Sequence, residues 1–557
     1  MNKIAISSNT FFKNIQVIDY ISIAKNLLLA LISGLVLSLT FLDHEYFYFA
    51  WVGFVPLLFA IKQTTFMQSY LLGLVAGGTL FTTAAYWVVD FIALSKDYGV
   101  YPGFLLAGLY WIYSAQAIAL PILLFKWLSQ YSRVHEFIVF PITMVFFLSV
   151  FPMLFPMHLA DTQVNFHMAL QAIEFVGVNG LDFVITLFNI LVYRVLVDMV
   201  FFRSNRIKTS KSPLIISALL IGLWFIYGIT AYSTWQDKIA TWDTLKVGLI
   251  QVNEVPKVGD RIDYPGYSQA YPPEMEMTER LSSTGADLII WPEAQSKRYL
   301  DDHTIQRAYQ QRMKALNTDL LFQDTQHIRD PISGDIIKKY NTAIMINDNG
   351  QQVDTYQKIK RIPFGEYIPI LEKESQLLKW VESLFGDFNS GLSQGVQHKA
   401  FKHKNVNIIP LICYETTFSE FVGMAVQQTL TQRNPAVGTL LVGLSNDGWF
   451  GSTHLPYQHI MPSVLRAVEN RLPLVHVANN GPSIIVTPDG NVIFTSEFQQ
   501  PAGYLIDVPN SSTEQGSFFS RHPSLFNNVI RFIFFLIILN ALLQSTGKLR
   551  NKRLNDV

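Results

Sequence analysis

The sequence is dominated by long apolar runs that short polar connections separate. Eight runs approach or exceed the length that a helix needs to cross a lipid bilayer, so we predict eight membrane-spanning helices, the second being marginal. The first run is followed at once by others, which favours a retained helix over a cleaved signal peptide. The runs lie near residues 26–42, 47–61, 69–94, 99–128, 137–157, 169–197, 213–233 and 527–544.

A long polar segment, residues 234–526, separates the seventh run from the eighth. Its short apolar runs alternate with helical patterns, which is typical of a layered α/β domain. Near its end, Pro482–Val508 predicts a hairpin that turns at Pro488-Asp489-Gly490. The predicted strands before it are 245–252, 286–291, 319–322, 342–346, 406–412, 439–444 and 474–478.

The chain is therefore predicted to have three parts. Residues 1–233 form a bundle of seven spans, residues 234–526 form the candidate catalytic domain, and residues 527–557 form a last span with a basic tail.

Lysine and arginine are concentrated in alternate connections of this predicted bundle. Because cytoplasmic connections hold an excess of these residues, both termini are predicted to be cytoplasmic and residues 234–526 to lie outside the cytoplasm. Among the opposite connections we find only Lys96. The residues on the cytoplasmic side are Lys3, Lys13, Lys25, Lys62, Lys126, Arg133, Arg203, Arg206, Lys208, Lys211, Lys548, Arg550, Lys552 and Arg553.

Composition narrows the possible chemistry. Half of the residues are hydrophobic and the formal net charge is zero, which fits a membrane protein and gives no basic field for nucleic acid. The single cysteine, Cys413, excludes an intramolecular disulfide and a multi-cysteine metal site. A lone cysteine is either a small buried hydrophobe or a nucleophile, and its context decides which.

The context of Cys413 is that of a nucleophile. The residue follows the predicted strand 406–412 and precedes a helical pattern from Phe418 to Gln428. An elbow between a strand and a helix exposes a side chain and directs free backbone N–H groups towards the substrate, where negative charge develops.

Three charged residues are candidates to act with this thiol. Glu293 follows the run 286–291, and Lys358 lies shortly before Glu366. A thiol needs a base or a nearby cation to become a thiolate, and these side chains would provide both. Each also has a structural alternative: Glu293 as a helix cap, Lys358 as a solvated charge, and Glu366 as a turn carboxylate paired with Arg361.

The motifs around these residues resemble the carbon-nitrogen hydrolase (nitrilase) superfamily and, more narrowly, the apolipoprotein N-acyltransferase family. The resemblance covers nearly the whole chain. Its motifs, in order, are Trp291-Pro292-Glu293, Tyr356-Gln357-Lys358, Pro363-Phe364-Gly365-Glu366, Cys413-Tyr414-Glu415, Ser445-Asn446-Asp447-Gly448-Trp449-Phe450-Gly451, Pro456-Tyr457-Gln458-His459, Arg466-Ala467-Val468-Glu469, Arg471-Leu472-Pro473 and Ala478-Asn479-Asn480-Gly481.

The resemblance implies a four-layer αββα sandwich on a transmembrane bundle in a bacterial inner membrane, with the catalytic domain in the periplasm. It implies that Glu293 is the general base, Lys358 stabilises the oxyanion and Cys413 is the nucleophile. The supporting site residues would be Glu366, Tyr414, Glu415, Trp449 and Phe450.

The implied reaction moves an acyl chain from phospholipid, usually phosphatidylethanolamine, to the α-amine of a lipoprotein's diacylglyceryl-modified N-terminal cysteine. No metal or organic cofactor is implied. The chain departs from the family pattern in Ala294-Gln295-Ser296-Lys297-Arg298 after Glu293. It departs again in Gln251–Tyr271, which lacks a tryptophan and offers Tyr264 and Tyr267 as the nearest aromatic residues.

Two other functions remain open at this point. A membrane-tethered amidase or nitrilase would use the same three residues and give the acyl group to water. A transporter or scaffold is suggested by Glu174, Asn179 and Asp182 in a predicted span, because charges within membranes often mark transport pathways.

Three further features carry less weight. The string Gly391-Leu392-Ser393-Gln394-Gly395 follows a polar turn rather than a strand, so it predicts a loop and not a serine nucleophile. His459 is interpreted as structural rather than catalytic. A helical apolar pattern predicts either a lid on the membrane surface or a core helix, and it consists of Leu377, Leu378, Trp380, Val381, Leu384 and Phe385.

Overall fold

The computed structural model describes residues 20–96, 99–201, 211–255, 264–368, 391–431, 437–514 and 516–555. The predicted lid pattern at 377–385 lies outside these residues, as do the predicted cytoplasmic residues Lys3, Lys13, Arg203, Arg206 and Lys208. The backbone of Lys96 is described, but its side chain is not.

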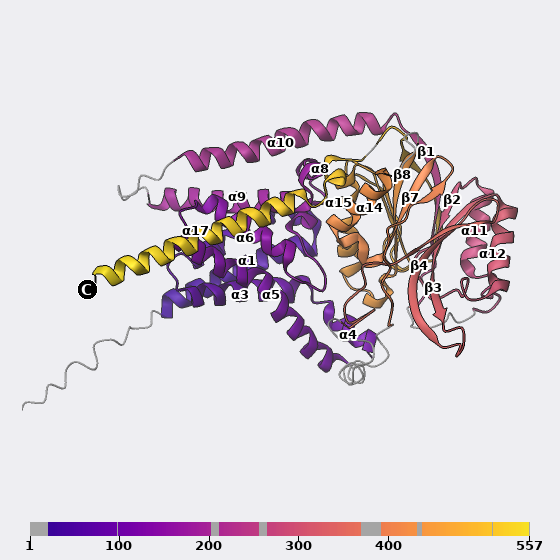
Figure 1. Cartoon of the computed structure of the whole chain (residues 1–557), viewed down its shortest axis with the longest axis horizontal. Coiled ribbons are helices and arrows are strands. Elements are labelled where there is room, and N and C mark those ends of the chain that lie inside the picture. The colour runs from indigo at the N-terminus through magenta and orange to yellow at the C-terminus, as the bar shows by residue number, and fades with distance from the viewer. Residues whose placement is uncertain are drawn as a thin grey trace, which may run out of the picture.

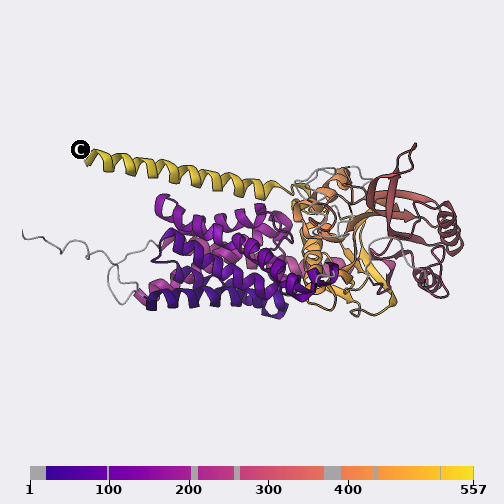
Figure 2. The same ribbon diagram turned by 90° about the horizontal axis from the view of Figure 1, so that it is seen from below.

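The chain forms a bundle of helices at one end and a layered domain with two sheets at the other (Figure 1). The view turned by 90° shows the same separation, with the last helix running along the bundle (Figure 2). The helices and 3-10 turns before the first strand are α1 (Tyr20–Leu42), η1 (His44–Trp51), α2 (Val55–Ala60), α3 (Phe66–Ala84), α4 (Val88–Lys96), α5 (Val100–Tyr131), α6 (Glu136–Val150), η2 (Leu159–Gln163), α7 (His167–Leu170), α8 (Ile173–Val176), α9 (Val178–Phe201) and α10 (Ser212–Ile239).

Among the described residues, five helices are long and apolar enough to cross a membrane. They are Tyr20–Leu42, Val100–Tyr131, Val178–Met199, Ser212–Ile239 and Leu525–Thr546. The predicted count of eight is therefore not confirmed. The marginal run 47–61 forms η1 and α2 rather than one helix, the run 137–157 gives only the 15-residue helix α6, and the start of 169–197 is broken into α7 and α8.

Small residues let the bundle helices approach closely. A Cβ on Gly34 of α1 would lie 2.4 Å from the carbonyl oxygen of Ala76 in α3, and a Cβ on Gly77 would lie 2.7 Å from that of Ala115 in α5. In lipid, where apolar side chains gain little from meeting one another, such close backbone packing is a main source of helix association.

The domain contains two six-stranded mixed sheets, in the orders β12-β1-β2-β3-β4-β5 and β11-β10-β9-β8-β7-β6. The strands are β1 (Asp243–Gln251), β2 (Leu288–Ile290), β3 (Asp319–Arg329), β4 (Ile336–Ile346), β5 (Gln352–Gln357), β6 (Phe401–His403), β7 (Val406–Ile412), β8 (Gly438–Ser445), β9 (Leu474–Ala478), β10 (Ile484–Val486), β11 (Val492–Thr495) and β12 (Ala502–Asn510).

All seven predicted strands before the hairpin are present, and β7 and β9 have the predicted bounds. The predicted hairpin is only partly correct. Strands β10 and β11 pair across the expected turn, but β12 leaves them and pairs antiparallel with β1 in the other sheet. In this way the last strand of the domain ties the second sheet to the first.

The two sheets pack face to face, and helices cover both outer faces. Apolar side chains from both sheets form one buried core, which includes Leu288, Met345, Ile408 and Val442. Helices α11 (Pro273–Ser283) and α12 (His303–Leu316) cover the first sheet, whereas α14 (Ser419–Thr431) and α15 (Leu455–Asn470) lie between the second sheet and the bundle (Figure 1). The predicted four-layer αββα sandwich is confirmed.

After the last strand the chain returns to the bundle through α16 (Phe518–Arg521) and α17 (Leu525–Asn555). Helix α17 packs against α5 and α6, and its C-terminal end lies at the end of the bundle away from the sheets (Figure 1).

A buried arginine fastens the domain to the bundle. Arg471, just after α15, is 1% exposed and donates hydrogen bonds of 2.9 Å to both carboxylate oxygens of Glu174 in α8. It also donates to the side chain of Gln171 at 2.8 Å and lies 4.8 Å from the ring of Trp235. Glu174, one of the charges that suggested a transport pathway, therefore binds the domain at its interface with the bundle.

We expect Arg471→Ala to lower stability markedly, because it leaves the carboxylate of Glu174 buried without its cation. Breaking one side of a buried ion pair costs about 3–5 kcal/mol. The thermal unfolding temperature of the detergent-purified protein should fall well below that of an Arg329→Ala control, whose side chain lies at the exposed end of β3. The double variant Arg471→Met with Glu174→Gln should recover part of the loss. Equal unfolding temperatures for Arg471→Ala and the control would show that the pair does not hold the interface.

Candidate active site

Cys413 stands at a strained elbow at the end of β7. All seven residues of β7 are buried, as expected for a strand inside a layered domain, and the 3-10 turn η5 (Cys413–Thr417) follows without a gap. Cys413 has a φ of +51°, in the left-handed region that residues with a side chain rarely adopt. Such strain persists only where the surrounding structure enforces it, and it is common at active sites.

The other two predicted catalytic residues come from the opposite sheet. Glu293 lies shortly after β2, and Lys358 directly follows β5. Glu293 accepts a hydrogen bond from the Asn341 side chain at 2.6 Å and a further one from the thiol of Cys413. The structure thus brings together Glu293, Lys358 and Cys413 between the two sheets. The first and last of these residues are 120 positions apart in the sequence.

Lys358 supplies the positive charge of this cluster. Its side chain is 1% exposed, and its ammonium group donates a 2.7 Å hydrogen bond to Glu366. Glu366 also accepts from the backbone N–H of Ile362 at 2.8 Å, which fixes its direction. The alternative pairing of Glu366 with Arg361 is wrong, because Arg361 lies over the ring of Tyr367 and donates to the carbonyl of Leu392.

Burial and mutual charge shift the pKa values of all three groups. Burial raises the pKa of Glu293, and Glu366 adds to this effect while Lys358 opposes it. Burial, followed by the charge of Glu293, raises the pKa of the Cys413 thiol well above its usual range, although Lys358 opposes this shift. Burial would lower the pKa of Lys358, but the carboxylates of Glu366 and Glu293 raise it instead. A charged lysine therefore faces a thiol that needs a proton acceptor.

Glu415 has a structural part in the site. It is fully buried and accepts hydrogen bonds from the backbone N–H groups of Ile412, Ile359 and Lys360, at 2.8, 2.7 and 3.0 Å. It thereby ties the end of β7 to the segment that carries Lys358.

Two cavities meet at Cys413. The first, which we call the apolar cavity, is bounded by residues of the bundle and of the domain, including Phe41, Trp87, Tyr110, Phe155 and Leu455. The second, the polar cavity, is lined by Glu293, Gln295, Ser296, Gln323, Asn341 and Asn446. Cys413, Phe155, Ile362 and Phe450 border both.

The remaining predicted site residues also border these cavities. Tyr414 lines the apolar cavity, and its hydroxyl donates a 2.5 Å hydrogen bond to the carbonyl of Leu154 in the bundle. Trp449 lines the polar cavity, while Phe450 stacks on Phe91 of α4 with ring centroids 4.9 Å apart. Gly391–Gly395 is irregular, as predicted.

Two residues that lie beside the candidate site were not predicted to be part of it. Asn341 in β4 holds the carboxylate of Glu293, but no motif marked it. His459, interpreted as structural, lines the apolar cavity beside Cys413 and lies 2.7 Å from Asp447. The signal that could have marked His459 as part of the site was its position in the motif Pro456-Tyr457-Gln458-His459.

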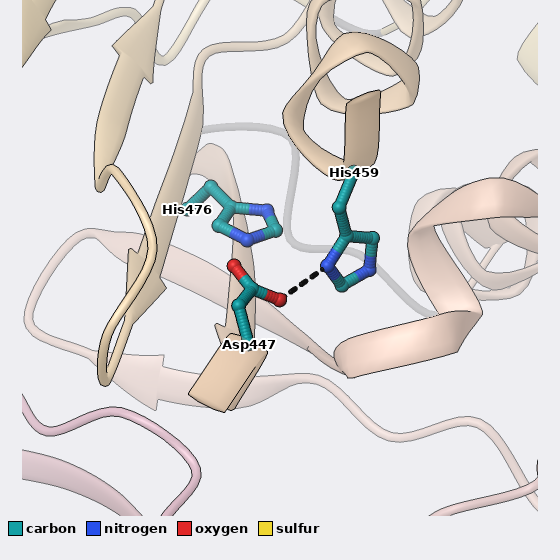
Figure 3. Close-up of side chains that lie close together, drawn as sticks. All are labelled: Asp447, His459 and His476. Atoms are coloured by element: carbon teal, nitrogen blue, oxygen red, sulfur yellow. Dashed lines mark hydrogen bonds and ion pairs between the residues drawn. The ribbon is translucent and has the colours of Figure 1, made fainter. Parts of the chain in front are cut away.

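Among the described residues, one group of histidines and carboxylates is close enough to hold a metal ion. The possible ligand atoms of Asp447, His459 and His476 all lie within 4.8 Å of one another (Figure 3). Asp447 and His459 already bind each other, and Nδ1 of His476 lies 2.9 Å from the hydroxyl of Ser463. Asp447 and His459 are thus joined directly, and His476 lies beside them with a separate bond to Ser463.

Comparison with known proteins agrees with this architecture. Residues 33–191 match the model of the apolipoprotein N-acyltransferase N-terminal domain, and residues 268–506 match that of carbon-nitrogen hydrolases. The apolipoprotein N-acyltransferase of Geobacter metallireducens is 28% identical over 92% of this chain and 95% of its own. That of Rickettsia typhi is 27% identical over 92% of this chain and 98% of its own. A solved amidase from Nesterenkonia is 16% identical, covers 51% of this chain and 95% of its own, and has a TM-score of 0.35.

The αββα sandwich with its Glu-Lys-Cys cluster defines a carbon-nitrogen hydrolase domain of the nitrilase type, here joined to membrane helices. The N-terminal bundle narrows this class. The chain carries the N-terminal domain of the apolipoprotein N-acyltransferase family, followed by the carbon-nitrogen hydrolase domain.

The electrostatics predict opposite effects of two substitutions on the reactivity of Cys413. Glu293→Gln removes a negative charge that raises the pKa of the thiol, so alkylation by iodoacetamide between pH 7 and 10 should be faster than in the wild type. Lys358→Met removes the opposing positive charge, so alkylation should be slower. Because Cys413 is the only cysteine, intact-mass measurement reports this site alone. An exposed-site control, Glu497→Gln, should leave the rate unchanged, and equal rates in all variants would contradict the proposed charge coupling.

Proposed function

We propose that this protein transfers an acyl chain from a membrane phospholipid to the N-terminal amine of diacylglyceryl apolipoproteins, with Cys413 carrying the chain as a thioester. The observation that carries the proposal is the position of Cys413 between the apolar cavity and the polar cavity. The apolar cavity suits an acyl chain chemically, and the polar cavity suits the ester that is attacked or the amine that attacks.

In the first half-reaction, Glu293 accepts the proton of the thiol while sulfur attacks the ester carbonyl carbon. The ammonium group of Lys358 and the backbone N–H of Tyr414 stabilise the oxyanion that forms. When the intermediate collapses, the bond between the carbonyl carbon and the glycerol oxygen breaks. Glu293 returns the proton to that oxygen, and a lysophospholipid leaves.

In the second half-reaction, the amine of the acceptor attacks the thioester carbonyl. Glu293 accepts a proton from the amine, the carbon–nitrogen bond forms and the carbon–sulfur bond breaks. The thiol then regains its proton. A covalent intermediate divides one difficult step into two and lets two large substrates use one cleft in turn.

Water is the competing acceptor, and transfer to water would make the protein a hydrolase. The apolar cavity argues against that outcome, because its aromatic walls leave water few partners near the thioester. We therefore take phospholipid, with phosphatidylethanolamine as the first candidate, as donor and the lipoprotein amine as acceptor.

Incubation with phosphatidylethanolamine alone should produce a persistent acyl adduct on Cys413 that hydroxylamine removes. Intact-mass measurement should find no adduct in Cys413→Ala. Glu293→Gln should form it roughly 10²–10⁴-fold more slowly, as expected for loss of a general base. A diacylglyceryl peptide with a free amine should discharge the adduct, whereas its N-acetylated form should not. Rapid release of free fatty acid without acceptor would favour the hydrolase, and an adduct on Cys413→Ala would exclude this nucleophile.

We also propose that the protein lies in the bacterial inner membrane with residues 234–526 in the periplasm. Two features support this orientation. The basic side chains of Lys126 and Arg133 flank the C-terminal end of α5, and α10 starts at the same end of the bundle, away from the sheets (Figure 1). That end therefore carries the positive charge expected on the cytoplasmic side.

Reporter fusions test the orientation directly. A fusion after Gln351, which is exposed in a turn of the domain, should report the periplasm, and a fusion at the C-terminus should report the cytoplasm. A cytoplasmic signal at Gln351 would overturn the proposed orientation without affecting the chemistry of the site.

A further inference from the structure

Two buried amide side chains of the polar cavity each have an oxygen atom without a partner. Asn341 in β4 is 6% exposed, and Gln295, shortly after Glu293, is 7% exposed. Both residues line the polar cavity together with Glu293 and Cys413. Among the described residues, neither Oδ1 of Asn341 nor Oε1 of Gln295 has a hydrogen-bond partner. Buried polar atoms are nearly always paired in proteins, so these two oxygen atoms point to a ligand that supplies the missing donors.

The orientation of both amides is fixed by the bonds that their nitrogen atoms make. Nδ2 of Asn341 donates a 2.6 Å hydrogen bond to the carboxylate of Glu293. Nε2 of Gln295 donates a 2.8 Å hydrogen bond to the backbone carbonyl of Val255. Turning either amide around would set its oxygen against another oxygen acceptor. The two free atoms are therefore acceptors, and only a group with N–H or O–H donors can satisfy them.

Asn341 lies next to the proposed catalytic residues. Its side chain holds the carboxylate of Glu293, and its backbone carbonyl accepts the N–H of Lys358 at 2.8 Å. Because Oδ1 and Nδ2 belong to one amide group, a donor bound to Oδ1 lies close to the carboxylate that Nδ2 holds. A ligand bound to Asn341 is thus placed beside the proposed general base.

The charge of the polar cavity favours a cation over an anion. Glu293 and Glu366 are the charged side chains among the described residues that line it. Lys358, which binds Glu366, offsets only one of these two negative charges. The phosphate of a lipid headgroup would be repelled by the remaining charge, whereas an ammonium group would be attracted.

A primary ammonium group has the donors that the free oxygen atoms need. The pKa of an α-amine is about 7.7–8.0, so most of it is protonated near pH 7 and carries three N–H groups. One of these can face Glu293, and the other two can face Asn341 and Gln295. The ammonium first loses one proton to solvent through Glu293. The resulting amine then reacts as proposed above, and Cys413 regains its thiol proton.

We propose that the polar cavity binds the primary ammonium group of the acceptor, with Oδ1 of Asn341 and Oε1 of Gln295 accepting hydrogen bonds from it beside Glu293. This assignment rests on the acyl-transfer function proposed above and explains how that site recognises its acceptor. Gln295 belongs to Ala294–Arg298, the segment in which the chain departs from the family pattern. One half of the ammonium site therefore comes from a departure that the acyl-transfer mechanism leaves unexplained.

The test measures the two half-reactions separately by intact mass. Formation of the acyl adduct on Cys413 is followed with phosphatidylethanolamine and with phosphatidylglycerol, which has no amine. Discharge of the adduct is then followed while the concentration of a diacylglyceryl peptide with a free amine is varied.

Gln295→Met keeps the length of the side chain but removes its acceptor oxygen. Adduct formation from either lipid should be unchanged, because the hydrogen bonds of Gln295 go to Val255 and Glu254 and not to the catalytic residues. The peptide concentration for half-maximal discharge should rise by about ten- to 100-fold, the loss expected for one hydrogen bond to a charged group. A side chain that only supported the fold would slow both half-reactions alike.

Asn341→Ala provides an independent arm. It should slow adduct formation, because Glu293 loses the hydrogen bond that orients it. It should also raise the peptide concentration for half-maximal discharge, by about the same factor as Gln295→Met. The second effect distinguishes the binding of the amine from the support of Glu293.

A further measurement changes the acceptor instead of the protein. An N-methylated peptide amine has one N–H fewer, so its half-maximal concentration on the wild-type adduct should be about tenfold higher or more. In Gln295→Met the ratio between the two peptides should be smaller, because one of the accepting oxygen atoms is already absent. The wild-type comparison stays decisive if a variant does not fold.

Gln310→Met is the matched control. Gln310 lies in α12, its Nε2 donates to the hydroxyl of Tyr299 at 3.3 Å, and it is not among the residues that line either cavity. Both half-reactions should proceed in this variant as in the wild type. Unfolding temperatures show whether each variant is folded.

Three outcomes would overturn the proposal. The first is unchanged discharge in folded Gln295→Met, and the second is equal discharge of the wild-type adduct by the primary and the N-methylated peptide. The third is slower adduct formation in Gln295→Met from phosphatidylethanolamine but not from phosphatidylglycerol, with normal discharge, which would assign the cavity to the ammonium group of the lipid. Absence of an adduct in the wild type would instead refute the thioester function.

Discussion

The site depends on burying a single lysine between two carboxylates. Lys358 is almost completely inaccessible and binds Glu366 directly, and the nearby charge of Glu293 also raises its pKa. Removing an ammonium group from water is costly, and only close partners of opposite charge offset the cost. Two carboxylates around one cation leave an excess of negative charge next to Cys413. That excess raises the pKa of the thiol, so the proposed chemistry begins with proton transfer to Glu293 rather than with a preformed thiolate.

The site residues that lie at the ends of apolar strands could be predicted from the sequence. Glu293 and Cys413 each follow an apolar run, and strand ends gather at one edge of a layered domain. Lys358 follows the polar strand β5, which was not predicted, and only the motif Tyr356-Gln357-Lys358 marked it. The partners of these residues could not be predicted in the same way. Asn341 lies within a strand, and Asp447 reaches His459 only because the turn η6 (Asp447–Phe450) packs against α15. Hydrogen bonds of this kind depend on tertiary packing, which residue spacing does not report.

Hydropathy predicted a bundle but not the number of its spans. A run of apolar residues has the same composition whether it faces lipid or the interior of the protein. The run 47–61 shows the difference: it forms two short elements in which Phe54, Leu57 and Leu58 are buried. The segment 169–197 was likewise predicted as one span, but Gly177, with a φ of +68°, separates α8 from α9. Glu174 is thereby placed where Arg471 of the domain can bind it.

The bundle therefore does more than hold the domain at the membrane. Phe41, Trp87, Tyr110 and Phe155 belong to it and form much of the apolar cavity that ends at Cys413. Neither part contains that cavity alone, so the domain must be held against the bundle at a fixed position for the cavity to exist. Gln458 and Arg471 provide such contacts towards opposite ends of α15. The interface and the apolar cavity therefore depend on each other, since the same helix α15 contributes residues to both.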